Sequence, residues 1–138
     1  MSARLFLDTN ILLYSISGAP AEARKSEIAI GLLDSDDCAL SVQVLQEFYV
    51  QATRESRADR ISHELASGLI ETWMRFAVQD NNVAVMQQAL AIRKAHGLSY
   101  RDSCIIAAAI AQGCCEVITE DMAHGRQLEG VGIVNPFL

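Results

Sequence analysis

Residues 5–10 read Leu-Phe-Leu-Asp-Thr-Asn, a short apolar run that ends at an aspartate. A continuous apolar run of this kind is typical of a strand that is covered on both faces of a sheet. Residues 117–121 repeat the pattern, since Val-Ile-Thr is followed there by Glu-Asp. Between these stretches, strand-like runs alternate with segments of helical periodicity. Strands separated by helices favour β-α crossover units, so we predict an α/β fold with a central, mainly parallel sheet.

The hydrophobic pattern divides the chain into short strands and amphipathic helices. Strands are predicted at residues 5–7, 39–40, 77–78, 117–118 and 132–134. Helices are predicted from about residue 10, at 21–33, after Ser41, at 60–76, at about 82–96 and at 103–111. Ser41 is a suitable N-cap and Gly97 a suitable C-cap for the helices that they flank. We expect residues 1–138 to form one domain, because this length is usual for a single core.

The composition is apolar for a small protein, with 51% hydrophobic residues. This surplus favours a protein partner or a homo-oligomer, although a tightly buried α/β core also absorbs apolar side chains. The formal net charge of −6 argues against a nucleic-acid partner, since phosphates attract Lys and Arg. That inference weakens if several carboxylates hold metal ions, because bound cations are then the largest local charges.

Several features predict a cytoplasmic protein with no membrane segment. No apolar stretch reaches the roughly 18 residues that a membrane span needs. The N-terminus lacks the apolar core of a signal peptide. The cysteines form no Cys-x-x-Cys pair and are expected to be small apolar core residues of a reduced protein. They are Cys38, Cys104, Cys114 and Cys115.

Four acidic residues stand next to predicted strands or helices. Asp8 and Asp121 follow separate strands, at the carboxyl ends where ligands bind in parallel sheets. Glu47 lies within a predicted helix and Asp102 immediately before one. If the four carboxylates converge, their mutual repulsion favours a divalent cation, and Mg²⁺ is usually shared between carboxylates and a phosphate. The pattern therefore indicates a metal-dependent enzyme that cleaves phosphodiesters.

Each acidic residue also has a purely structural interpretation. Asp8 is able to cap the first helix, and Asp121 a turn that follows it. Ser99 and Asp102 have the spacing of a capping box, in which each side chain caps the other residue's backbone N–H. Glu47 lies opposite the apolar stripe of its helix, which is typical of a solvated side chain. Capping and metal binding are compatible, because a cap does not consume both carboxylate oxygens.

The chain also carries an ordered set of short motifs. They are Leu-Asp-Thr-Asn-Ile-Leu at 7–12, Gln-Glu-Phe at 46–48, Tyr-Arg-Asp-Ser at 100–103, Thr-Glu-Asp-Met-Ala-His-Gly at 119–125 and Val-Asn-Pro-Phe at 134–137. Together they resemble the PIN domain, and in particular the VapC-type toxins of bacterial toxin–antitoxin pairs. The resemblance implies a three-layer α/β/α fold and a Mg²⁺- or Mn²⁺-dependent endoribonuclease. It also implies a cognate antitoxin whose C-terminal segment covers the active site, and commonly a homodimer.

The resemblance assigns roles to individual residues. The acidic quartet that binds the metal and carries out catalysis is matched by Asp8, Glu47, Asp102 and Asp121. The flanking polar positions that support metal, water or phosphate are matched by Thr9, Asn10 and Thr119.

Four arginines are candidate RNA contacts: Arg54, Arg57, Arg101 and Arg126. A basic rim beside a metal site would hold the RNA backbone, although Arg54 and Arg57 fit a solvated helix end equally well. Arg101 departs from the family pattern, since many relatives carry an aromatic residue before this aspartate. The departure bears on substrate contacts rather than on the metal site.

Two other functions stay open at this stage. A phosphatase with an aspartate nucleophile would use Asp8 to attack phosphorus, but Asn10 breaks the Asp-x-Asp pattern expected of that chemistry. A catalytically silent member would act as an RNA- or protein-binding module. Binding alone does not need a concentrated negative site, so the intact quartet argues against that alternative.

Overall fold

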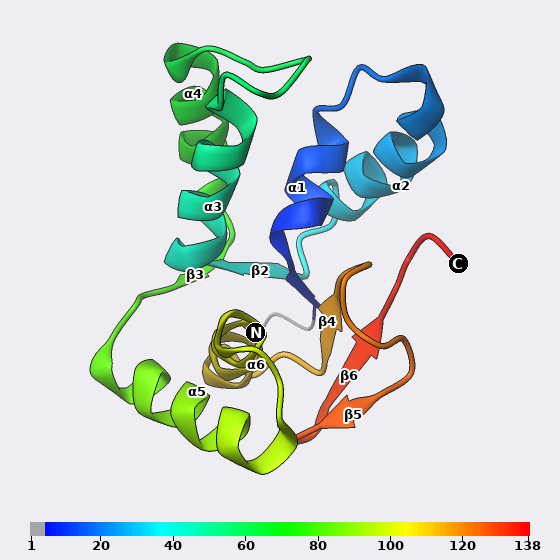
Figure 1. Ribbon diagram of the computed structural model, residues 1–138. Helices are drawn as coiled ribbons and strands as arrows, with labels where there is room; N and C mark the ends of the chain where they lie inside the picture. The colour runs from blue at the N-terminus through cyan, green and yellow to red at the C-terminus, as the bar shows by residue number, and fades with distance from the viewer. Residues whose placement is uncertain (1–4) are drawn as a thin grey trace.

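The computed structural model describes residues 5–138, which form a six-stranded sheet with helices on both faces (Figure 1). The strand order is β3-β2-β1-β4-β6-β5. The strands are β1 (Leu5–Leu7), β2 (Cys38–Ser41), β3 (Ala77–Gln79), β4 (Glu116–Ile118), β5 (Gln127–Leu128) and β6 (Val131–Val134). Neighbouring strands are parallel except β5 and β6, which pair antiparallel. The predicted mainly parallel sheet is confirmed.

The helices divide between the two faces because β-α-β crossovers are right-handed. They are α1 (Thr9–Ser15), α2 (Ala23–Leu33), α3 (Val42–Thr53), α4 (His63–Trp73), α5 (Val83–His96) and α6 (Tyr100–Ala111), with a 3₁₀ turn at Pro20–Glu22. The steps from β1 to β2 and from β2 to β3 run in one direction and place α1 to α4 on one face. The step from β3 back to β4 places α5 and α6 on the opposite face (Figure 1). This arrangement confirms the three-layer α/β/α fold.

Local capping sets most helix boundaries. Ser41 caps α3 through its side chain, and Gly97 ends α5 with a φ of 69°, as the sequence predicts. The prediction of a helix over residues 60–76 is wrong at both ends, because Ser62 is the N-cap and Met74 the C-cap of α4. α6 begins earlier than predicted, because Ser99 is its N-cap. Within residues 5–138, no helix is long and apolar enough to cross a membrane.

The direction of strand addition reverses between β1 and β4, and this point positions the candidate site. The two strands are parallel, with Leu7 opposite Ile118. The backbone N–H of Asp8 donates to Ile118 O at 3.0 Å, so Asp8 and Thr119 leave the sheet side by side. Ligands of open α/β sheets bind beyond the carboxyl ends of the strands at such a reversal.

The cysteines differ in burial. Cys38 and Cys114 are buried, as predicted, but Cys115 is exposed, so the prediction of a core position is wrong for that residue. Cys104 is half-buried. Burial raises the pKa of Cys38 to about 11 and that of Cys114 to about 12. Because the thiolate is the reactive form, both buried thiols are expected to be inert near neutral pH.

Alkylation of the native protein with iodoacetamide at about pH 8 is therefore expected to modify Cys115 and to leave Cys38 and Cys114 intact. The thiolate of Cys38 forms only as the pH rises toward its pKa of about 11, so the labelling rate should increase with pH. Peptide mass spectrometry over a time course measures each site, and protein unfolded in urea is the control in which every thiol reacts. Rapid native labelling of Cys38 or Cys114 would contradict their burial.

Candidate active site

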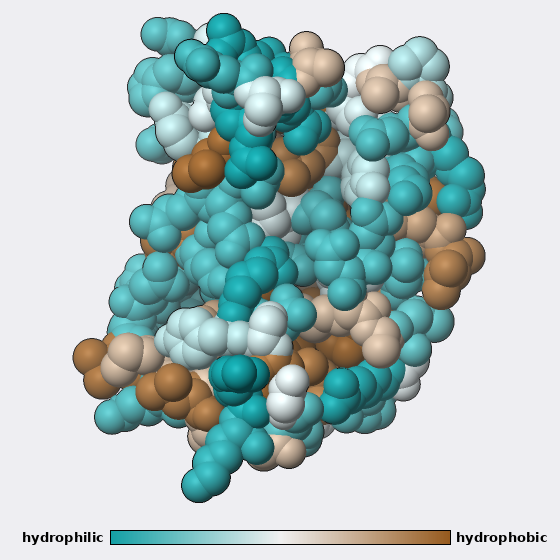
Figure 2. Space-filling view, in the orientation of Figure 1, coloured by the Kyte–Doolittle hydropathy of each residue, from teal (hydrophilic) through white to brown (hydrophobic). Residues whose placement is uncertain are grey.

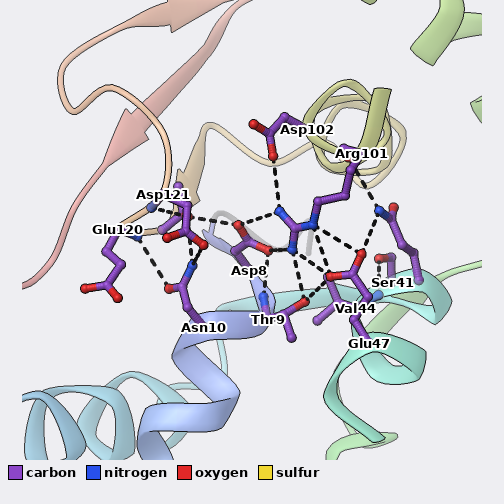
Figure 3. A network of polar contacts seen from close by, with 12 residues as sticks. Asp8, Thr9, Asn10, Ser41, Val44, Glu47, Arg101, Asp102, Glu120 and Asp121 are labelled. Atoms are coloured by element: carbon purple, nitrogen blue, oxygen red, sulfur yellow. Dashed lines mark hydrogen bonds and ion pairs between the residues drawn. The ribbon is translucent and has the colours of Figure 1, made fainter. Parts of the chain in front are cut away.

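Asp8 is the most deeply placed acidic residue of the site, with 0% of its surface exposed. Its Oδ1 accepts a hydrogen bond from the backbone N–H of Thr9 at 2.7 Å, which caps α1. Its Oδ2 accepts one from the Thr119 hydroxyl at 2.9 Å, across the boundary between β1 and β4. The interpretation of Asp8 as a helix cap is confirmed. The same carboxylate also faces the other acidic side chains (Figure 3), so capping does not exclude a functional role.

Glu47 reaches the site from α3, and its side chain is 29% exposed. Oε2 accepts a hydrogen bond from the Thr9 hydroxyl at 2.8 Å, and Oε1 accepts one from Gln43 Nε2 at 3.3 Å. Its interpretation as a solvated side chain is wrong, because α1 packs beside α3 and this face meets the site. Burial alone would raise the pKa of Glu47, but hydrogen bonds from Arg101 and Thr9 outweigh burial and lower it.

Asp102 lies in the first turn of α6. Its backbone N–H donates to Ser99 Oγ at 3.1 Å, which confirms the predicted cap at Ser99. The other half of the predicted capping box is replaced, since the Asp102 carboxylate points into the site and accepts a hydrogen bond there (Figure 3). The backbone N–H of Asp102 therefore takes part in the cap of α6, while its carboxylate is a group of the candidate site.

Asp121 lies at the rim of the site and is exposed. Its Oδ2 accepts a hydrogen bond from Asn10 Nδ2 at 3.0 Å, and its backbone N–H donates to the Thr119 hydroxyl at 3.1 Å. Since Thr119 also donates to Asp8, it connects the rim to the buried centre. The predicted supporting residues Thr9, Asn10 and Thr119 therefore each contact a carboxylate of the site. Thr9 contacts Glu47, Asn10 contacts Asp121 and Thr119 contacts Asp8.

Arg101 is the side chain that joins the carboxylates (Figure 3). Its Nη2 donates to Asp8 Oδ1 at 2.6 Å and to Glu47 Oε2 at 2.7 Å. Its Nη1 donates to Asp102 Oδ1 at 3.1 Å. Burial would lower the pKa of Arg101, but hydrogen bonds with Asp8 and Glu47 outweigh burial and raise it further, so the guanidinium is a permanent cation. The sequence pattern indicated a substrate contact here and contained no sign that the residue would point among the acids.

The other candidate RNA-contacting arginines lie away from this network. Arg54 is the exposed C-cap residue of α3, and Arg57 pairs with Asp59 at 3.0 Å in the loop that follows. Arg126 is exposed just before β5. Across residues 5–138, none of these three side chains donates a hydrogen bond to the four carboxylates. Of the four candidate arginines, the structure brings Arg101 into the site.

A second polar group beside Asp121 was missed by sequence reasoning. Glu120 accepts hydrogen bonds from the Tyr14 hydroxyl and from Lys25 Nζ, the latter at 2.8 Å. These contacts tie the loop after β4 to α1 and α2, and so hold Asp121 in place. In the sequence, only the position of Glu120 next to Asp121 could have indicated its role. Its partners Tyr14 and Lys25 lie far away in the sequence, in α1 and α2.

The ligand atoms of the site suit a hard divalent cation, since they are carboxylate, hydroxyl and amide oxygens. A cavity of about 290 Å³ opens there, lined by Glu47, Asp102 and Asp121 among others. Within residues 5–138, no three His, Cys, Asp or Glu side chains are arranged as a ready ligand group. The carboxylates of Asp8, Glu47 and Asp102 are held apart by the guanidinium of Arg101, which contacts all three. The oxygen ligands are therefore of the type that Mg²⁺ or Mn²⁺ prefers, but the distances between them match the size of the guanidinium.

Sequence comparison gives one clear match. The family model described as PIN domain matches residues 5–126 of this chain. No curated protein matches the sequence.

Solved structures share the fold at low sequence identity. A toxin–antitoxin complex from Klebsiella pneumoniae matches with a TM-score of 0.70 and 22% identity, over 96% of this chain and 97% of that one. FitAcB from Neisseria gonorrhoeae matches with a TM-score of 0.61 and 21% identity, over 96% and 98%. VapC20 from Mycobacterium tuberculosis, a sarcin-ricin loop cleaving toxin, matches with a TM-score of 0.62 and 20% identity, over 82% and 86%. At these identities the likeness shows the fold alone.

Proposed function

Because the chain belongs to the PIN domain family, we propose that it is a divalent-metal-dependent endoribonuclease and the toxin of a toxin–antitoxin pair. The observation that carries the proposal is the gathering of Asp8, Glu47 and Asp102 around the guanidinium of Arg101, with Asp121 at the rim. Like charges held this close favour a cation between them. VapC20, which has a similar fold, is a sarcin-ricin loop cleaving toxin, and this supports RNA as the substrate class.

In this proposal the four carboxylates hold Mg²⁺ or Mn²⁺: Asp8, Glu47, Asp102 and Asp121. A bound ion of this kind supplies a Lewis acid for a phosphate oxygen and lowers the pKa of a water. The chain itself supplies the positioning. The hydroxyls of Thr9 and Thr119 orient the carboxylates of Glu47 and Asp8, and the Asn10 amide orients Asp121.

The RNA backbone would contact arginines that lie outside the carboxylate cluster. Arg54 and Arg126 are exposed and Arg57 is half-buried. Contacts of this kind fix the register of a nucleic acid without reading its sequence. A chain of net charge −6 would then still bind RNA locally through these arginines. A bound metal ion would also offset the negative charge of the carboxylates.

Two protein partners belong to the proposal, and both suit a cytoplasmic protein. A cognate antitoxin is supported by the similar structure from Klebsiella pneumoniae, which is a toxin–antitoxin complex. A homodimer is supported by exposed apolar side chains on α5, where Figure 2 shows hydrophobic atoms gathered on the surface. These side chains are Val83, Met86 and Leu90.

One observation favours a second candidate function, a catalytically silent RNA- or protein-binding module. The guanidinium of Arg101 already offsets part of the negative charge, so the cluster has a structural cation without any metal. A phosphatase with Asp8 as nucleophile is less well supported, because Asp8 is fully buried and both its oxygens accept hydrogen bonds.

Incubation of the purified protein with total cellular RNA tests the proposed function. With Mg²⁺ or Mn²⁺, wild-type protein is expected to produce discrete fragments that disappear with chelator and with Asp102→Asn. Sequencing of the fragment ends then identifies the target RNA. Identical results for wild type and Asp102→Asn, over several metals and with antitoxin shown to be absent, would favour the binding module instead.

A further inference from the structure

Arg101 lies between two cavities. One, of about 290 Å³, opens onto Glu47 and Asp102; the other, of about 520 Å³, lies between α3, α5 and α6. Arg101 lines both of them. From this geometry we infer that Arg101 is an internal cation that competes with the metal ion for the carboxylates and withdraws when the ion binds. The inference rests on the proposed function and adds a regulatory residue to its site.

The guanidinium uses the oxygen atoms that a metal ion would need. It donates to both oxygens of Asp8, both oxygens of Glu47 and one oxygen of Asp102, at 2.6 to 3.2 Å. Asp8 is fully buried and the Arg101 side chain is 34% exposed, so salt screens these contacts weakly. Three carboxylates facing one another without a cation would be strongly destabilising. Because a metal ion would need the same oxygen atoms, the two cations are expected to replace each other at this point.

The neighbouring cavity offers the Arg101 side chain a second position. Its lining includes Gln43 and Asn81, whose side-chain amides donate hydrogen bonds through nitrogen and have carbonyl oxygens able to accept from a guanidinium. The backbone stays in place, because Arg101 lies in α6 and its carbonyl oxygen accepts a hydrogen bond from Gln43 Nε2 at 3.4 Å. Rotation about side-chain bonds is sufficient to move the positive charge from the carboxylates to the cavity.

Isothermal titration of Mn²⁺ into the protein, with no RNA present, tests the competition. Arg101→Gln is expected to bind Mn²⁺ at least about tenfold more tightly than wild type, since a competitor that leaves a tenth of the molecules competent weakens the apparent affinity tenfold. The matched control is Arg60→Gln, the same change at an exposed arginine outside the site, and it should bind Mn²⁺ as wild type does.

A second readout and a second variant keep the test independent of folding. The Tm of metal-free Arg101→Gln should fall, and Mn²⁺ should raise it more than it raises that of wild type. If Arg101→Gln does not fold, Arg101→Lys replaces it. Lysine keeps the charge but lacks the planar fork that bridges several carboxylates, so its Mn²⁺ affinity should exceed that of wild type.

The outcomes separate this inference from the proposed function. Mn²⁺ affinity in the folded Arg101 variant that equals or falls below that of wild type would overturn the competition and leave the metal-dependent nuclease standing. Failure of wild type and the Arg101 variant alike to bind Mn²⁺ would overturn the competition and also remove the metal from the proposed function. Tighter binding by the variant, with Arg60→Gln unchanged, supports the inference even if no RNA is cleaved.

Discussion

Asp8→Asn is expected to lower the rate of RNA cleavage by at least about a thousandfold, which corresponds to roughly 4 kcal/mol of activation free energy. Asp8 is fully buried, and its two oxygens meet Thr9, Thr119 and Arg101. Asparagine keeps one oxygen for the cap of α1 but loses the charge and turns an NH₂ donor toward other donors. Initial rates of cleavage at saturating Mn²⁺ measure the effect, and circular dichroism verifies the fold.

The matched control for this change is Asp80→Asn, which removes one carboxylate from an exposed position after β3. It should leave the cleavage rate within about twofold of wild type, because screened surface charges contribute little. A folded Asp8→Asn protein that keeps a tenth or more of the wild-type rate would show that Asp8 is not part of the catalytic centre.

Phe48→Ala is expected to lower the free energy of unfolding by about 3 to 5 kcal/mol, since it removes a fully buried aromatic ring and leaves a cavity in the core. Phe48 packs edge-to-face on Trp73, with ring centroids 4.7 Å apart, and so joins α3 to α4. It also follows Glu47 directly, so this packing fixes the part of α3 that presents the carboxylate. Urea denaturation followed by circular dichroism measures the loss.

Val50→Ala is the control for the packing of α3, because Val50 lies on the same helix and is 56% exposed. Its expected effect is within about 0.5 kcal/mol. A loss below about 1 kcal/mol in Phe48→Ala would mean that the surrounding side chains collapse into the space and that α3 is not anchored through this ring.

Local features of the chain were sufficient to predict most elements of the fold. Buried strands and amphipathic helices differ in the period of their apolar residues, and caps such as Ser41 and Gly97 act on their own helix. β5 was missed because two residues, Gln127–Leu128, carry no period of their own. It is a strand through its antiparallel pairing with β6, which is a tertiary contact even though it is close in sequence.

The sequence by itself was sufficient to predict the four carboxylates of the candidate site, because Asp8 and Asp121 end strands and the ordered motifs include Glu47 and Asp102. Only the tertiary structure decided which cation three of these carboxylates meet. Arg101 contacts Glu47 and Asp8 across 54 and 93 residues of chain. The direction of its side chain depends on how α1, α3 and α6 pack around the carboxyl end of the sheet. No local period or cap encodes contacts of that range, so an arginine that reads as a substrate contact in the sequence lies among the carboxylates in the fold.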